Sequence, residues 1–158
     1  MSRLFFLRKP EYSDGRIDLI PIRVLPPDRA LGFGRERVWR ITEQGGRKEI
    51  GRISYRDGES RGIYYYGHIG YHIDPPWRGH HYAAAACHLI LEEIRMSGKS
   101  SVVITCDPDN EASRKVCLAL GCVLEGETDV PLDLQERFDI SARKCRYIWR
   151  VGEEKGDR

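Results

Sequence analysis

The chain has 158 residues, with 26 basic and 24 acidic side chains, a net charge of +2 and an apolar fraction of 41%. Such a length fits one domain over residues 1–158, large enough for a hydrophobic core. The balanced charge argues against nucleic-acid binding, which favours a basic face, and the apolar runs are too short to span a membrane. Met1–Leu7 is too short and too weakly charged for a signal peptide, so we expect a cytoplasmic protein.

Cysteine usage agrees with that compartment. The five cysteines are odd in number and show no Cys-x-x-Cys spacing: Cys87, Cys106, Cys117, Cys122 and Cys145. All but the last stand in apolar segments. We therefore predict reduced, buried thiols.

The first half of the chain, up to about Asp74, has the patterns of β-strands. Near-alternating apolar residues predict a strand at Ile17–Val24. Arg35–Thr42 and Glu49–Tyr55 flank a glycine-containing turn and predict a hairpin. Ile63–Ile73 is rich in aromatic and β-branched residues and predicts a long strand.

The second half alternates helices and strands. Apolar residues at helical spacing predict helices at Tyr82–Met96 and Glu111–Leu120, with one further helical turn at Leu132–Phe138. Short apolar runs predict strands at Ser101–Cys106, Cys122–Glu125 and Cys145–Val151. The order indicates an α+β sandwich with a mixed, mostly antiparallel central sheet of about six to seven strands and helices on both faces.

The stretch DPPWRGHHYAAAACHLILEE joins a strand to a helix and has the composition of an anion site. The first N–H groups of a helix lack partners within the helix, and the helix dipole makes that end positive. Arg78 adds a charge, Gly79 allows close backbone approach, and the first acidic residue of the helix is Glu92. The alternative is a plain tight turn whose alanines pack against the sheet.

Two motifs resemble the GCN5-related N-acetyltransferase (GNAT) superfamily. Arg78–Ala83 is similar to its acetyl-CoA motif, [Arg/Gln]-x-x-Gly-x-[Gly/Ala]. Asn110–Cys122 is similar to its next motif, Asn-x-x-[Ala/Ser]-x-x-apolar-x-x-x-x-Gly-aromatic, and Glu125-Gly126 resembles the branch that acetylates the N-termini of ribosomal proteins. The resemblance covers about residues 63–126.

The resemblance implies that acetyl-CoA is the co-substrate and that no metal is needed. Backbone amides of the family's fourth strand would hold the pantetheine arm, here at Tyr71, His72 and Ile73. A β-bulge in that strand, with Gly70 as its expected position, would open a gap beside it. The pyrophosphate would bind to the loop and the helix start, at Arg78, Gly79, His80, His81, Tyr82, Ala83 and Ala84. The pantetheine would bind to the side chain of Asn110.

Three departures from the family pattern stand out. His81 occupies a motif glycine position, so it has to adopt backbone angles that suit a non-glycine residue. Cys117 stands where many members place a tyrosine that protonates the leaving thiolate. Pro26–Gly34 is too short for the pair of helices that usually covers the acceptor, so that pocket is open or is completed by the N-terminus or another subunit.

Proton transfer has three candidate catalytic residues, His68, His72 and Cys117. A neutral imidazole on the active-site strand could accept a proton from the amine, and a thiol could protonate the leaving CoA. Each also has a structural interpretation, the histidines as half-exposed strand residues and Cys117 as a small apolar side chain. The histidines lack a third ligand at recognisable spacing, which argues against zinc.

The expected function is acetyl transfer from acetyl-CoA to a primary amine of a small molecule or a protein, by direct attack in a ternary complex. The alternative is a catalytically impaired module that binds or senses acyl-CoA. The expected partners are acetyl-CoA and an unidentified amine, without nucleic acid or membrane, and the sequence leaves a homodimer open.

Overall fold

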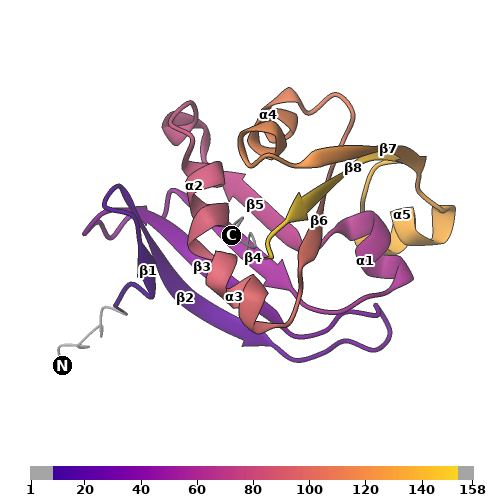
Figure 1. The fold of residues 1–158 in the computed structure, drawn as a ribbon, viewed down its shortest axis with the longest axis horizontal. Helices are drawn as coiled ribbons and strands as arrows, with labels where there is room; N and C mark the ends of the chain where they lie inside the picture. Colours follow the sequence, from indigo (N-terminus) through magenta and orange to yellow (C-terminus); the bar gives the residue numbers. More distant parts are fainter. Residues whose placement is uncertain (1–8, 153–158) are drawn as a thin grey trace, which may run out of the picture.

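The computed structural model describes residues 9–152, and its strands form two antiparallel sheets (Figure 1). The larger sheet has five strands in chain order: β1 (Tyr12–Ser13), β2 (Ile17–Leu25), β3 (Glu36–Glu43), β4 (Gly51–Arg56) and β5 (Ile69–Ile73). The smaller sheet has the order β6-β8-β7: β6 (Ser101–Cys106), β8 (Arg143–Arg150) and β7 (Val123–Asp129). The α+β prediction is confirmed, with the strands divided between two sheets. Met1–Leu7, on which the absence of a signal peptide was predicted, lies outside the described residues.

The helices pack against these sheets as the predicted alternation requires. They are α1 (Arg61–Tyr66), α2 (Tyr82–Leu89), α3 (Leu91–Met96), α4 (Glu111–Ala119) and α5 (Leu132–Phe138), with a 3₁₀ turn η1 at Pro75–Trp77. Helices α2 and α3 follow one another across the five-stranded sheet (Figure 1). They form one kinked helix, because the backbone of Ile90 leaves helical angles while its N–H still donates to Ala86 and its carbonyl accepts from Ile94. No helix within residues 9–152 has the length and apolar character to cross a membrane.

The strand predicted over Ile63–Ile73 is wrong in its first part, which forms helix α1. Ser60 caps this helix, accepting a hydrogen bond of 3.1 Å from the N–H of Ile63, and Gly67 ends it at φ 85°. A side chain on Gly62 would lie 2.4 Å from the carbonyl oxygen of Leu31, so the helix packs closely on the preceding loop. The caps and this packing outweigh the β-propensity of the three tyrosines.

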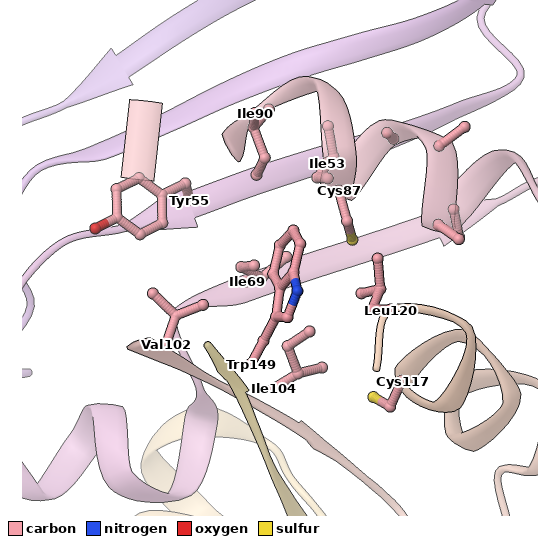
Figure 2. Close-up of a cluster of buried hydrophobic side chains, with 14 of the residues drawn as sticks. Ile53, Tyr55, Ile69, Cys87, Ile90, Val102, Ile104, Cys117, Leu120 and Trp149 are labelled. Carbon is pink, nitrogen blue, oxygen red and sulfur yellow. The ribbon is translucent and has the colours of Figure 1, made fainter. Parts of the chain in front are cut away.

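One hydrophobic core joins the two sheets (Figure 2). Trp149 of β8 lies between Ile69 of β5 and Cys87 of α2, all of them buried. The five cysteines are also buried, and none of them forms a disulfide. Burial of this apolar surface, at about 25 cal/mol per Å², fixes the two sheets against each other on the helical side.

Strand β5 pairs with β4 in regular register, with Ile69 opposite Tyr55 and Ile73 opposite Gly51. The bulge expected at Gly70 is therefore absent from this strand. Register shifts occur instead in β2, between Pro21 and Arg23, and in β7, near Leu124–Gly126. A bulge in β5 does not explain why the two sheets separate beside this strand.

Candidate active site

A cavity of about 620 Å³ lies where β5 and β6 diverge. Its walls come from both strands, the loop before α2, the first turns of α2 and α4, and the segment before β8. The predicted site residues that line it are Tyr71, His72, Ile73, Arg78, Gly79, His81, Tyr82, Ala83, Ala84 and Asn110. The cavity thus brings together two motifs that lie about thirty residues apart in the chain.

The loop before α2 holds two residues in the left-handed region of backbone angles, Gly79 and His81. His81 is the N-terminal cap at φ 61° and ψ 24°, in the left-handed region, and Gly79 has φ 87°. Histidine is among the non-glycine residues that occupy this region more readily. The departure from glycine at position 81 is therefore compatible with the backbone shape of the loop.

The first turn of α2 presents free amides to the cavity. Hydrogen bonding within the helix begins at Ala85, whose N–H donates to the carbonyl of His81 over 3.1 Å. Among the described residues no side chain caps this end, and its first turn holds no acidic residue. The N–H groups of Tyr82, Ala83 and Ala84 therefore carry the positive end of the helix dipole into the cavity.

Arg78 adds a fixed cation beside these amides. Its Nε donates a hydrogen bond of 2.8 Å to the carbonyl oxygen of Ile73, the last residue of β5. This bond orients the side chain and leaves the terminal nitrogens of the exposed guanidinium directed to solvent. The combination of helix start, glycine loop and arginine can hold a phosphate group.

The amides of β5 alternate between β4 and the cavity. The N–H of Asp74 donates to Ile50, and the carbonyl of His68 accepts from Arg56, so even-numbered residues face β4. By the same alternation, Tyr71 and Ile73 direct their N–H groups away from β4, toward the cavity. His72, predicted with them, faces β4 with its backbone and is also among the residues that line the cavity.

Asn110 stands at the start of α4, at the wall opposite α2. Its Oδ1 caps the helix by accepting a hydrogen bond of 3.1 Å from the N–H of Ser113. Asn110 is among the residues that line the cavity, and its Nδ2 has no hydrogen-bond partner within residues 9–152. Lys115, one turn further along α4, adds a cation to this wall that sequence reasoning missed.

His80 differs from the other predicted loop residues because it does not line the cavity. It is exposed, its ring stacks on Tyr82 at 5.3 Å, and its carbonyl accepts a hydrogen bond of 3.3 Å from Arg16. The contact ties the loop to the turn before β2. In this structure His80 therefore stabilises the loop.

The three candidates for proton transfer lie in three different environments. His72 lines the cavity, with its side chain 62% exposed and its Nε2 at 3.2 Å from Asp74. Cys117 is fully buried in the core, where a hydrogen bond with Cys122 and burial raise the pKa of its thiol. His68 is also buried, outside the cavity, and both of its ring nitrogens contact backbone atoms. The structure therefore brings only His72 of these three to the cavity.

An aromatic cluster closes the end of the cavity opposite the loop. Phe33, Tyr66 of α1 and Phe138 of α5 stack on one another with ring centroids 5.2–5.6 Å apart. The buried guanidinium of Arg56 lies 4.3 Å from the ring centroid of Tyr66, and both line the cavity. This cluster occupies the region that the short segment Pro26–Gly34 leaves without helices.

Asp107 is the single carboxylate among the cavity-lining residues of the described chain. Its Oδ1 accepts hydrogen bonds from Ser141 at 2.6 Å and Lys144 at 2.7 Å. Although burial opposes them, these two donors lower the pKa of Asp107, which is therefore ionised at neutral pH. Sequence reasoning missed this pair, because position 144 meets position 107 only through the fold.

The donor set of the cavity fits a long phosphorylated ligand. Free amides and an arginine stand at one end, and outward-facing strand amides and an asparagine follow along its length. Acetyl-CoA has phosphates at one end and amides along its arm, in the same order. Within residues 9–152 no cluster of three or more histidine, cysteine or acidic side chains could hold a metal ion.

Fold and site together define an α+β domain built to bind a phosphorylated cofactor between two diverging sheets. Residues 22–123 match the sequence profile of the family described as the acetyltransferase (GNAT) domain. The chain belongs to this GNAT family, whose members use acetyl-CoA as co-substrate. A sequence search of curated proteins found no match.

Solved structures with a similar fold include three acetyltransferases. The ribosomal-protein-S5-alanine acetyltransferase from Vibrio fischeri is 22% identical, with a TM-score of 0.59 over 76% of this chain and 64% of its own. The microcin C7 self-immunity acetyltransferase MccE, in complex with acetyl-CoA and AMP, is 23% identical, with a TM-score of 0.55 over 73% and 61%. The Salmonella typhimurium enzyme that modifies the N-terminal serine of ribosomal protein L7/L12 is 19% identical, with a TM-score of 0.55 over 74% and 64%. The chain thus spans less than two thirds of each of these proteins.

Proposed function

We propose that the protein is an acetyl-CoA-dependent N-acetyltransferase that acts on a primary amine by direct attack in a ternary complex. The observation that carries this proposal is the cavity itself. It joins a helix start that can hold a phosphate to a strand with free amides, and its wall also holds a carboxylate, Asp107. One ligand of two parts, or two ligands, would fill such a cavity.

The cofactor end would hold acetyl-CoA through backbone groups. The amides of Tyr82, Ala83 and Ala84, with Arg78, would bind the pyrophosphate. The amides of Tyr71 and Ile73 and the Nδ2 of Asn110 would bind the pantetheine arm. When bound, acetyl-CoA supplies an activated acetyl group.

The acceptor end would receive the amine. Oδ2 of Asp107 has no hydrogen-bond partner within residues 9–152, so this oxygen can accept a hydrogen bond from an incoming ammonium group. Attack by the neutral amine forms the carbon–nitrogen bond, breaks the carbon–sulfur bond, and passes one proton from the nitrogen to the CoA sulfur, so that CoA leaves as the thiol. Before the attack the ammonium has to lose another proton, because only the neutral amine has a free lone pair. The imidazole of His72, which lines the same cavity, is the candidate to take up that proton.

Free protein N-termini are the acceptor class to test first. Two of the similar structures, from Vibrio fischeri and Salmonella typhimurium, belong to acetyltransferases that act on ribosomal proteins. Pro26–Gly34 holds no helix, so the helical pair that usually covers the acceptor in the family is missing from this segment. An α-amine is also less basic than a lysine side chain, so more of it is neutral at pH 7.

The test combines calorimetric titration of acetyl-CoA with detection of released CoA thiol. Peptides with a free N-terminus and no lysine are compared with the same peptides blocked at the N-terminus. We expect acetyl-CoA to bind and to raise the melting temperature, and CoA release to require the free N-terminus. Absence of acetyl-CoA binding would overturn the proposal.

The alternative, a module that binds acyl-CoA without turnover, has one observation in its favour. Two of the three candidate residues for proton transfer, His68 and Cys117, do not line the cavity. Acetyl-CoA binding without CoA release from any peptide, lysine derivative or small amine would establish this alternative. Release that depends on His72 would exclude it.

A further inference from the structure

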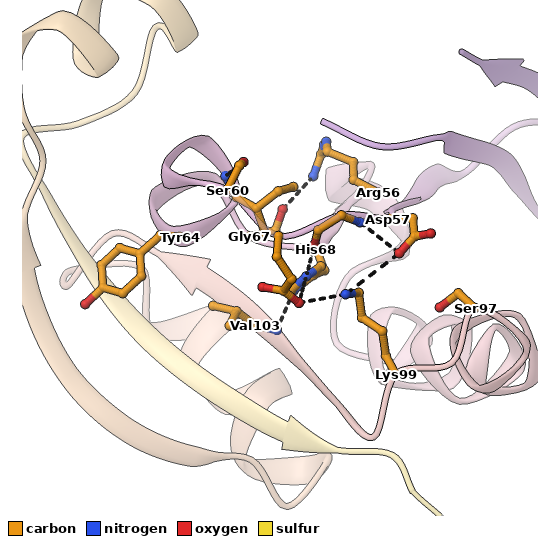
Figure 3. A network of polar contacts seen from close by, with 12 residues as sticks. Arg56, Asp57, Ser60, Tyr64, Gly67, His68, Ser97, Lys99 and Val103 are labelled. Atoms are coloured by element: carbon orange, nitrogen blue, oxygen red, sulfur yellow. Dashed lines mark hydrogen bonds and ion pairs between the residues drawn. The ribbon is translucent and has the colours of Figure 1, made fainter. Parts of the chain in front are cut away.

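His68 stands between α1 and β5 with both ring nitrogens bonded to backbone atoms (Figure 3). The N–H of Val103 donates to Nδ1 over 2.9 Å, so Nδ1 carries no hydrogen. The proton is therefore on Nε2, which donates to the carbonyl oxygen of Gly58 over 3.0 Å. The ring is neutral, 1% exposed and fully used by these contacts.

The imidazole of His68 accepts a hydrogen bond from Val103 of β6. Val103 is also the last residue of β6 with a backbone hydrogen bond to the segment that leads into β5. Its carbonyl oxygen accepts a hydrogen bond of 2.8 Å from the N–H of His68. In a continuous parallel pair the N–H of Val103 would bond to a carbonyl of the neighbouring strand. Here the imidazole of His68 takes the place of that carbonyl.

Beyond this point β5 turns entirely to β4. The carbonyl of His68 accepts from the N–H of Arg56 over 2.7 Å, and the residues that follow pair in register with β4. The walls of the cavity begin at the next residue of each strand, Ile69 on β5 and Ile104 on β6. The strands therefore separate directly after the His68–Val103 contact.

The ring is also fixed from behind, by the loop between β4 and α1. Gly58 and Glu59 belong to this loop, and Glu59 accepts a hydrogen bond of 2.6 Å from Lys99, just before β6. The Glu59 carboxylate lies 3.4 Å from Nε2 of His68. These contacts hold the imidazole at a fixed position between the two sheets.

We propose that His68 is a positioning residue for acetyl-CoA: its side chain replaces one strand-to-strand hydrogen bond and thereby fixes the gap in which the pantetheine arm is held. In a regular β5 without a bulge, contact with β6 ends at His68, where the carbonyl accepts from Arg56 of β4 and the ring accepts from the N–H of Val103. The inference rests on the proposed function, because it concerns the binding of the same co-substrate.

Two variants separate the two ring nitrogens. His68→Asn places an oxygen near the position of Nδ1, so it keeps the acceptor for Val103 and loses the donor to Gly58. His68→Gln places an amide nitrogen near Nε2, so it keeps the donor and loses the acceptor. Each variant loses one buried hydrogen bond, and we expect both melting temperatures to fall by a similar amount, about 2–6 °C.

The first readout is the binding of CoA, measured by calorimetry, together with the Michaelis constant for acetyl-CoA. We expect His68→Asn to bind CoA within about threefold of the wild type and His68→Gln to bind about tenfold more weakly. Equal weakening in both variants, or wild-type affinity in a folded His68→Gln, would overturn the proposal.

The second readout needs no cofactor and is hydrogen exchange of the Val103 amide, followed by NMR. We expect slow exchange in the wild type and in His68→Asn, and fast exchange in His68→Gln. If the wild-type protein does not bind CoA, the proposed function fails, while the exchange pattern still decides whether His68 holds the strand. An unprotected Val103 amide in the wild type would refute the role of the imidazole directly.

Discussion

The two ends of the cavity are built in different ways. The proposed cofactor end consists mainly of backbone groups, those of Tyr71 and Ile73 and of the segment Arg78–Ala84, whose conformation is set by local turn and helix geometry. The proposed acceptor end consists of side chains from segments that meet only in the folded chain, among them Tyr66, Asp107 and Lys144. The first kind of site resists substitution because the backbone persists, whereas the second can change its specificity through single residues.

The largest effect is expected where a charge is added to the backbone site. His81→Asp keeps a residue that tolerates the left-handed region and adds a carboxylate where the phosphates would lie. At about 4 Å, such like charges repel by about 4 kcal/mol at an effective dielectric constant near 20. We expect CoA affinity, measured by calorimetry, to fall about a hundredfold or more.

The matched control for this prediction is His81→Asn, which has the same shape as aspartate without its charge. It should bind CoA within a few fold of the wild type, and the melting temperature of both variants should stay the same or rise, because either residue can cap the helix. Equal losses of CoA affinity in the two variants would mean that the shape of the side chain at position 81, rather than the amide end of α2, governs binding.

A tenfold effect is expected at Arg78, whose guanidinium lies beside the amides at the start of α2. Arg78→Ala removes both the cation and the Nε bond to Ile73, and CoA affinity should fall about tenfold. Arg78→Lys retains the charge and loses the bond, so its affinity should lie between those of Arg78→Ala and the wild type. Equal affinity of the lysine variant and the wild type would show that the tether to β5 contributes nothing to binding.

A smaller and more selective effect is expected at the acceptor end. Asp107→Asn removes the charge that would hold the ammonium, so the Michaelis constant for a peptide amine should rise about fivefold, a free-energy change of about 1 kcal/mol. The Michaelis constant for acetyl-CoA should stay unchanged. Asp129→Asn is the control, since this carboxylate also has an ion-pair partner, Arg143, but lies outside the cavity. Parallel rises in both constants would contradict the separation of the two ends.

The last effect concerns stability rather than binding, and it arises at His68. Burial lowers the pKa of His68 below its ordinary value of 6.5, although the nearby Glu59 opposes this shift. The unfolded chain therefore binds one more proton below about pH 6.5, and the free energy of unfolding should fall with decreasing pH until the folded pKa is reached. The slope is at most about 1.4 kcal/mol per pH unit.

Denaturant unfolding at several pH values would measure this slope, with His68→Asn as the control that lacks it. The charged groups that face the ring are Glu59 and Lys99, together with Asp57, which lies 3.8 Å from Lys99. The bond from Lys99 lowers the pKa of Glu59, so this carboxylate stays ionised across the window. An identical slope in the wild type and the variant would show that His68 does not titrate there.

The sequence predicts the cofactor end better than any other part of the molecule. The conformation of the loop before α2 depends on residues within a single turn, so the residue pattern of that turn is enough to predict it. Helix α1 shows the opposite case: its tyrosines favour a strand, and the decisive features are its caps, Ser60 and Gly67, and a loop thirty residues earlier. Those caps were visible in the sequence, whereas the packing was not.

The roles of His68 and Asp107 depend on partners that are distant along the chain. The sequence places His68 in the active-site strand, yet its ring accepts a hydrogen bond from Val103, 35 residues later. Asp107 depends on Lys144, 37 residues later. Neither contact follows from local spacing, because the pairing of β6 with β8 and the position of α1 decide both.

The burial of all five thiols has a practical consequence for assays. A reagent that reacts with exposed thiols, added to count released CoA, finds no accessible cysteine thiol on the folded chain. Each unfolded chain would expose five. The baseline of the enzyme assay is therefore also a measure of unfolded protein, so a variant that loses activity by unfolding can be told from one that loses activity alone in the same cuvette.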